Sequence, residues 1–245
     1  MINRLALRIS ASVAALAFSL PVLCLAQSNI SRVTITHLRP DMVSEWVDLQ
    51  KNEVVPALKK AGIKTRTVYS SGLFGNSYEY VSIQPIEKFA DFDAGNPVTK
   101  ALGATASARL GEKLRKCTLS QNSFQSTRLV DLSNPIDTAP LIIVSTRVRI
   151  APGRMPEFEN IVKTDVLPLY KKLKVTYTVN RRGLGTNSND VTLSTGLSKY
   201  ADLDSPNPIV RALGPEGAAK LLAKFTGIAT LVEQVVRSRV ADLSF

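Results

Sequence analysis

The sequence has few of the residues that usually carry metal, redox or nucleophilic chemistry. It contains one histidine, His37, one tryptophan, Trp46, and two cysteines, Cys24 and Cys117. It has no nucleophile elbow, no phosphate-binding loop and no Cys–His pair. We therefore expect no metal and no cofactor, and the sequence names no catalytic residue.

The sequence also has no long hydrophobic run, and its one apolar stretch has the form of a secretory signal. Arg4 and Arg8 precede an uncharged segment from Ile9 to Leu20, which is too short for a membrane span. The small residue Ala26 then marks a cleavage site. We predict a signal peptide over residues 1–26 and a periplasmic or secreted protein that begins at Gln27.

The two cysteines cannot form an internal disulfide in that mature protein. Cys24 would leave with the signal peptide, and Cys117 would remain as a buried thiol. Lipid attachment to Cys24 is the alternative reading. The preceding Leu23 is against it, because the acceptor cysteine of a lipoprotein usually follows a small residue.

Basic residues outnumber acidic ones, with 31 Lys+Arg against 20 Asp+Glu and a formal net charge of +11. Removing Arg4 and Arg8 leaves about +9, which favours acidic partners. The basic residues are scattered along the chain and form no run. We therefore expect a small-molecule ligand, no nucleic acid, and no membrane association after cleavage; a higher oligomer stays open.

An internal repeat is the most informative feature of the sequence. The segment FADFDAGNPVTKALG at residues 89–103 recurs as YADLDSPNPIVRALG at residues 200–214. The same offset of 111 positions relates RLVDLS at 128–133 to RVADLS at 239–244, and an offset of 112 relates the segments before Gly62. A duplication explains this pattern.

Each copy predicts the same order of elements. Alternating β-rich segments at 33–39 and 141–150 predict the first strands, and each is followed by a helix that Pro56 or Pro168 should kink. Glycine-rich turns at 72–76 and 183–187 predict hairpins. Asn-Pro pairs at 96–97 and 207–208 begin a second helical region, and Gly103 and Gly214 should end its short first segment. Fourth strands follow at 124–131 and 235–242.

The order β-α-β-β-α-β is the ferredoxin-like unit, whose sheet leaves one face bare. We predict an α+β protein in which two tandem ferredoxin-like βαββαβ repeats, 31–133 and 141–245, are joined by a linker, 134–140. Their antiparallel sheets would pair face to face as an intramolecular dimeric α/β barrel. Each copy would then cover the bare face of the other.

With its repeat, its element order and the helix ends VVPALKKAG and VLPLYKKL, the chain resembles the dimeric α/β-barrel superfamily. That superfamily includes antibiotic-biosynthesis monooxygenases, haem-degrading monooxygenases, stress-responsive barrel proteins and the two-repeat chlorite dismutase group. The resemblance implies the barrel fold but carries no family-specific catalytic motif. In the chlorite dismutase group the haem-binding histidine lies in the C-terminal copy, and this chain has no histidine there.

Strand alternation predicts which side chains face the space between the sheets. His37 and Arg149 hold equivalent positions in the two copies, and Arg147 lies on the same face of its strand as Arg149. On the last strand of the second copy, Arg237 and Arg239 share one face, and Arg128 holds the place in the first copy that corresponds to Arg239. A cavity lined by guanidinium groups favours an anion. The predicted ligand-binding residues are His37, Arg128, Arg147, Arg149, Arg237 and Arg239. The alternative places these arginines at strand ends, in salt bridges or in solvent, and His37 in a structural hydrogen bond.

Two further motifs are interpreted as structural. The repeated Asp-x-Asp pairs, Asp91 with Asp93 and Asp202 with Asp204, precede helix starts, and no other ligands accompany them. Trp46 falls on a helix that packs on the sheet, where a core role is expected.

The sequence thus predicts an extracytoplasmic barrel protein that binds a small anionic or aromatic ligand between its two sheets. One alternative is a cofactor-independent monooxygenase of the antibiotic-biosynthesis type, which needs few signature side chains. The other is a structural or interaction protein whose barrel is filled by its own side chains. A large cavity would favour the first two over the third.

Overall fold

A computed structural model describes residues 29–134 and 138–245. The predicted signal peptide and residues 135–137 of the predicted linker lie outside this range. In the described part of the chain, no helix is both long and apolar enough to cross a membrane.

The first half of the described chain contains four strands and four α-helices. The strands are β1 (Ile30–Leu38), β2 (Thr67–Phe74), β3 (Glu79–Pro85) and β4 (Thr118–Arg128), and the α-helices are α1 (Val43–Leu49), α2 (Val55–Lys60), α3 (Pro97–Leu102) and α4 (Ala104–Cys117). Short 3-10 turns are η1 (Pro40–Met42), η3 (Phe89–Phe92) and η4 (Val130–Leu132), and η2 (Gln50–Val54) is a π-helical turn.

The second half follows the same order with three α-helices. Its strands are β5 (Ile142–Ile150), β6 (Tyr177–Arg182), β7 (Asp190–Leu197) and β8 (Ala229–Arg239), and its α-helices are α5 (Met155–Ile161), α6 (Leu167–Lys172) and α7 (Pro208–Ala223). The turns are η5 (Val162–Val166), which is π-helical, and the 3-10 turns η6 (Tyr200–Asp204) and η7 (Ala241–Leu243).

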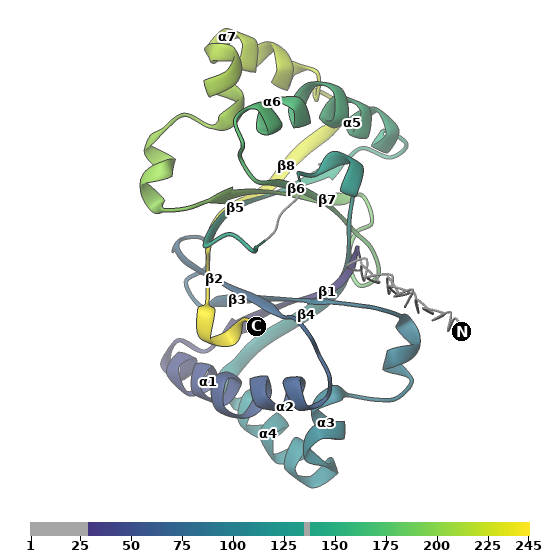
Figure 1. Ribbon diagram of the computed structural model, residues 1–245, viewed down its shortest axis with the longest axis vertical. Coiled ribbons are helices and arrows are strands. Elements are labelled where there is room, and N and C mark those ends of the chain that lie inside the picture. Colours follow the sequence, from purple (N-terminus) through teal and green to yellow (C-terminus); the bar gives the residue numbers. More distant parts are fainter. Residues whose placement is uncertain (1–28, 135–137) are drawn as a thin grey trace, which may run out of the picture.

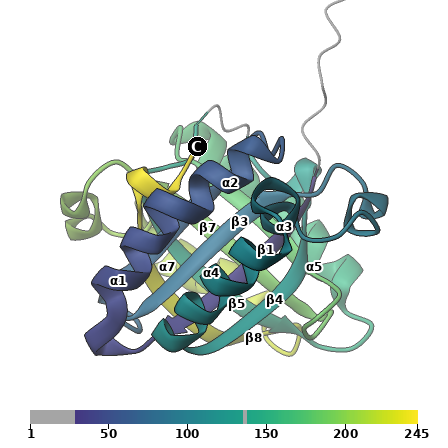
Figure 2. The same cartoon turned by 90° about the horizontal axis from the view of Figure 1, so that it is seen from below.

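The eight strands form one closed antiparallel barrel in the order β1-β3-β2-β8-β5-β7-β6-β4. Two seams join the halves: β2 pairs with β8, and β4 pairs with β6. The helices lie outside the barrel, with α1–α4 on one side and α5–α7 on the other (Figure 1). Seen from below, α1–α4 lie across the strands of the first half (Figure 2). The predicted α+β barrel is confirmed.

The helices form because their apolar faces pack on the outer faces of the sheets. In the first half, Trp46, Leu49 and Leu58 pack with Val68 and Leu110, and the ring centroids of Trp46 and Tyr80 lie 4.8 Å apart. The second half has its own core, which includes Phe158, Val162, Leu167, Tyr170 and Tyr177. The expected core role of Trp46 is confirmed, and Cys117 is also buried.

The two prolines inside the long helices are accommodated by π-helical turns. A proline ring clashes with the carbonyl four residues earlier, and the proline lacks an N–H. Ahead of Pro56 and Pro168, η2 and η5 widen the helix, and the Val55 and Leu167 N–H groups donate to carbonyls five residues back, at Gln50 and Val162. The sequence predicted a kink, and a π turn is the form it takes.

The second helical regions begin and bend where the sequence indicated. Asn96 and Asn207 cap them through their side chains, which accept from the backbone N–H groups of Val98 and Val210. Gly103 separates α3 from α4 with a φ of 82°, and Gly214 bends α7 with a φ of 71°.

Candidate functional site

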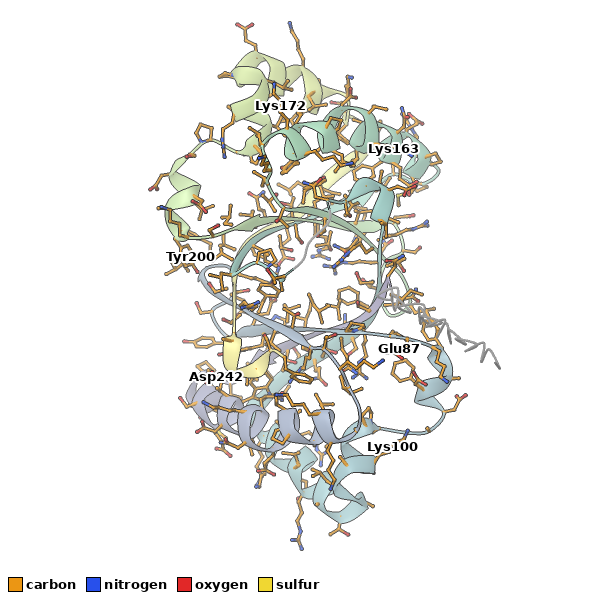
Figure 3. The ribbon with its side chains drawn as sticks, viewed as in Figure 1. Glu87, Lys100, Lys163, Lys172, Tyr200 and Asp242 are labelled. Atoms are coloured by element: carbon orange, nitrogen blue, oxygen red, sulfur yellow. The ribbon has the colours of Figure 1, made fainter. Side chains whose placement is uncertain are left out.

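The barrel encloses a cavity of about 1110 Å³. Side chains from both sheets extend into the enclosed space (Figure 3). Exposed lining residues gather beyond the strand ends on one side of the barrel, where Asn29, Thr65, Arg128 and Thr138 surround the opening. The cavity therefore has a mouth at the end where β1 and β5 begin.

The two walls of the cavity differ in chemistry. The wall formed by the first half is apolar at its centre, where the side chains form one cluster: Val33, Ile35, Val81, Ile83 and Phe124. The facing wall of the second half is mostly hydroxyl and amide: Ser145, Thr178, Asn180, Thr192 and Ser194. Sequence positions that the repeat aligns differ between the two walls: Val33 corresponds to Ser145, and Ile83 corresponds to Ser194. A ligand in this cavity meets an apolar face on one side and hydrogen-bonding groups on the other.

The lining carries a strong excess of positive charge. It has seven basic residues and one acidic residue, Asp131; the basic ones are Arg66, Arg128, Lys163, Lys171, Arg182, Arg237 and Arg239. Of the cavity-lining basic residues, only Arg237 has an ion pair within residues 29–134 and 138–245. A cavity lined mostly by positive charge attracts anions.

Arg66 is a buried guanidinium without an acidic partner in the described chain. Its side chain donates through Nη2 to Gln50 Oε1 at 2.9 Å, while Nη1 is sealed from solvent and has no partner. Burial, and then the charge of Arg32, lowers the pKa of Arg66 to about 10. The group is still charged at neutral pH, so it adds positive potential near the mouth.

Ala139 and Pro140 of the predicted linker line the cavity and are held there by hydrogen bonds. Arg239 Nη1 donates to Ala139 O at 2.9 Å, and the Tyr69 hydroxyl donates to Pro140 O at 3.1 Å. Arg239 Nε is buried without a partner. Burial raises the pKa of Tyr69 to about 12 against the opposing charge of Arg239, so this phenol stays neutral.

Arg182 is a lining arginine whose guanidinium keeps free hydrogen-bonding capacity. It is the last residue of β6, its Cζ lies 4.4 Å from the centroid of Phe124, and its Nε donates to Thr192 Oγ1 at 3.1 Å. Within the described residues its Nη1 and Nη2 have no hydrogen-bond partner, and they are not sealed off. Burial, and then the charge of Arg147, lowers the pKa of Arg182 to about 10.

Two buried carboxylates occupy the barrel end opposite the mouth. Glu79 Oε1 accepts from Arg237 Nη2 at 2.6 Å and from Ser71 Oγ at 3.2 Å, while Oε2 lies 3.1 Å from His37 Nε2. Asp190 holds the position equivalent to Glu79 in the second half.

Asp190 is surrounded by arginines. Its carboxylate accepts from Arg149 at 2.7 and 3.2 Å and from Arg147 at 3.4 Å. Burial raises the pKa of Asp190, but the hydrogen bond and charge of Arg149 outweigh it and hold the pKa below its usual value. These ion pairs form a polar layer at the far end of the cavity, which we call the ion-pair layer: His37, Glu79, Arg147, Arg149, Asp190, Glu233 and Arg237.

The six predicted ligand-binding residues divide into two groups. Arg128, Arg237 and Arg239 line the cavity. His37, Arg147 and Arg149 lie on the expected inward faces of their strands but past the end of the cavity, in the ion-pair layer. The depth of the second group along the strands differs from the expected one, because alternation predicts the face of a residue but not where a cavity ends. A ligand contact remains a prediction for all six residues.

Sequence reasoning missed Arg66 and Arg182. Arg66 lies just before β2, and Arg182 is the last residue of β6. The repeat could have identified Arg182, because the residue that aligns with Arg182 in the first copy is Ser71, which is uncharged. A gain of charge at an otherwise matching inward position marks a divergence between the two copies.

Of the repeated aspartates, Asp202 has a structural role, at the start of the 3-10 turn η6. Asp202 Oδ2 accepts from the backbone N–H groups of Ser198 and Lys199 at 2.9 and 3.1 Å, and these bonds lower its pKa. No cluster of metal-ligating side chains occurs among the described residues.

The residues present do not fit a haem. The described cavity lining includes no histidine, cysteine or methionine, and its one phenol, Tyr69, is used by Pro140 O. His37 lies outside the cavity, with Nδ1 3.1 Å from Ser120 Oγ and Nε2 3.1 Å from Glu79. The space between sheet and helices in the second half is filled by its apolar core.

No protein-family model matches this sequence, and no curated protein matches it. Solved structures of similar shape do exist. A candidate monooxygenase from Lactobacillus acidophilus NCFM superposes with a TM-score of 0.56 at 9% identity, covering 88% of this chain and 94% of the other.

Two other solved structures agree. An anthrone oxidase-like protein gives a TM-score of 0.57 at 11% identity, over 86% of this chain and 91% of the other. A chlorite dismutase variant from Candidatus Nitrospira defluvii gives 0.54 at 11% identity, over 89% and 94%. At such low identity these likenesses show the fold alone, which is the dimeric α/β barrel that the sequence indicated.

Proposed function

With the dimeric α/β barrel as the premise, we propose that this chain is an extracytoplasmic protein that binds a small organic anion inside its barrel. We also propose that its two halves are tandem copies of one ferredoxin-like unit. The offsets of 111 and 112 positions between matching segments and the equal order of strands in the two arcs of the barrel support the second statement.

The observation that carries the binding function is the cavity of about 1110 Å³ with seven basic lining residues and one acidic residue. A volume of this size is in the range of small-molecule sites. Unpaired buried guanidinium groups are costly, so water or an anion must compensate them. The apolar wall of the first half adds a surface for the hydrocarbon part of a ligand.

Isothermal titration of the mature protein tests this function. We expect benzoate and cyclohexanecarboxylate to bind and benzyl alcohol to bind at least ~10-fold more weakly, because a charge-assisted hydrogen bond contributes about 1.5–3 kcal/mol. Raising the salt concentration should weaken only the carboxylates. Equal binding of acid and alcohol, or no binding of either, would refute an anion site.

The extracytoplasmic location rests on the charged, apolar and cleavage regions of residues 1–26. We expect mass spectrometry of the exported protein to give a chain that starts at Gln27. A variant with Ala26→Leu should accumulate uncleaved, because the cleavage site needs a small residue. An intact Met1 in the wild-type protein of the cell envelope, or a lipid on Cys24, would contradict the proposal.

A cofactor-independent monooxygenase is the second candidate, because two of the similar structures carry the names monooxygenase and anthrone oxidase-like. Oxygen consumption with a quinol substrate would distinguish it from a binding protein. The volume of the cavity favours both over a barrel filled by its own side chains.

A further inference from the structure

One positive charge has no counterpart among the described residues where the deep end of the cavity meets the ion-pair layer. Four guanidinium groups lie at this boundary, those of Arg182 and Arg237 in the cavity lining and those of Arg147 and Arg149 beyond it. The carboxylates that face them are Glu79, Asp190 and Glu233. Each of these arginines except Arg182 has an ion pair with one of the carboxylates. The excess charge therefore lies on Arg182.

The position of Arg182 shows why this residue forms no ion pair. Its equivalent in the first half, Ser71, donates to Glu79, but Asp190 is already occupied by Arg149 and Arg147. Across the β4–β6 seam Arg182 faces Ser126, a hydroxyl. Its guanidinium is instead fixed from behind, by the Phe124 ring and by Thr192 Oγ1. A guanidinium held in this way is pre-organised for a planar, bidentate oxyanion.

Phe124 connects this charge to the apolar wall. It stacks on Arg182 and also belongs to the cluster with Val33 and Val81. We propose that Arg182 anchors the anionic group of the ligand at the deep end of the cavity, and that the ligand is an organic monoanion, a carboxylate or sulfonate, whose apolar body lies on the wall of the first half. This inference rests on the proposed anion-binding function and names its anchor and the orientation of the ligand.

A pair of fluorescent dyes separates the two parts of the proposed ligand. The compounds 8-anilinonaphthalene-1-sulfonate and N-phenyl-1-naphthylamine share one apolar body, and only the first carries a sulfonate. Both are titrated into the mature full-length protein as wild type, as Arg182→Met, and as Arg181→Met. Arg181 is the matched control, because it is the neighbouring residue of β6, is exposed, and does not line the cavity.

Arg182→Met is expected to weaken binding of the sulfonate dye about 10-fold or more, because a charge-assisted contact is lost. The affinity for the neutral dye should not change. Arg181→Met should change neither. Ile83→Ser, which copies the residue Ser194 of the opposite wall, should weaken both dyes in parallel. Thermal melting of each variant shows whether it is folded.

The outcomes distinguish this inference from the proposed function. If the wild type binds the sulfonate dye and Arg182→Met binds it equally well, or if that variant weakens both dyes alike, Arg182 is not the anchor while the anion-binding function stands. If the wild type binds neither dye nor the carboxylates, both proposals are wrong.

Discussion

Glu79→Gln is expected to lower the free energy of unfolding by about 3–5 kcal/mol, because it leaves the buried Arg237 guanidinium without its counter-charge. Glu79 accepts from Arg237 at 2.6 and 3.2 Å, and both side chains are almost fully buried. Replacing a carboxylate by an amide keeps the volume, so packing changes little. Urea denaturation of the purified mature protein measures the difference.

Two comparisons make this result specific to the buried pair. Glu87→Gln removes a surface carboxylate that pairs with Lys64 at 2.9 Å in an exposed position, and it should cost at most about 1 kcal/mol. Glu79→Met combined with Arg237→Met removes both charges and should recover most of the loss. A loss of less than about 1 kcal/mol in Glu79→Gln, or no recovery in the double variant, would show that an uncompensated charge on Arg237 is not the source of the cost.

A fragment from Gln27 to Asn134 is expected to lose its stable monomeric state. Cutting there exposes the apolar wall of the first half, including Val33, Ile83 and Phe124, and it leaves β2 and β4 as unpaired edges. Exposed apolar sheet faces and open edges drive association. Sedimentation velocity should show dimers or aggregates, whereas the full chain serves as the control. A well-folded monomer would mean that the two halves are independent domains.

The repeat explains how much of this architecture was predictable from one sequence. Two aligned copies show twice where strands, helices and turns must lie, so that even Gly103 and Gly214 could be assigned to breaks between helical segments. Strand alternation also placed His37, Arg147 and Arg149 on the inward face. These are local properties of the chain, and period and capping chemistry determine them.

The cavity could not be predicted in the same way. The ion-pair layer depends on the depth at which strands from both halves meet, and Arg237 reaches Glu79 across 158 positions of sequence. Arg182 is left without an ion pair because Arg147 and Arg149 already pair with Asp190. No local sequence pattern shows which of several arginines will pair with a given carboxylate. The sequence indicated that the cavity lining would be basic, but not which guanidinium would be left without an ion pair.

Because both seams close within one polypeptide, the barrel does not depend on an equilibrium between monomer and dimer. In a barrel assembled from two separate subunits, the cavity would disappear on dilution below the dissociation constant of the dimer. Here β2–β8 and β4–β6 are joined by the same chain that links the halves. Each molecule therefore has one complete cavity at any concentration, with an apolar wall and a polar wall facing each other.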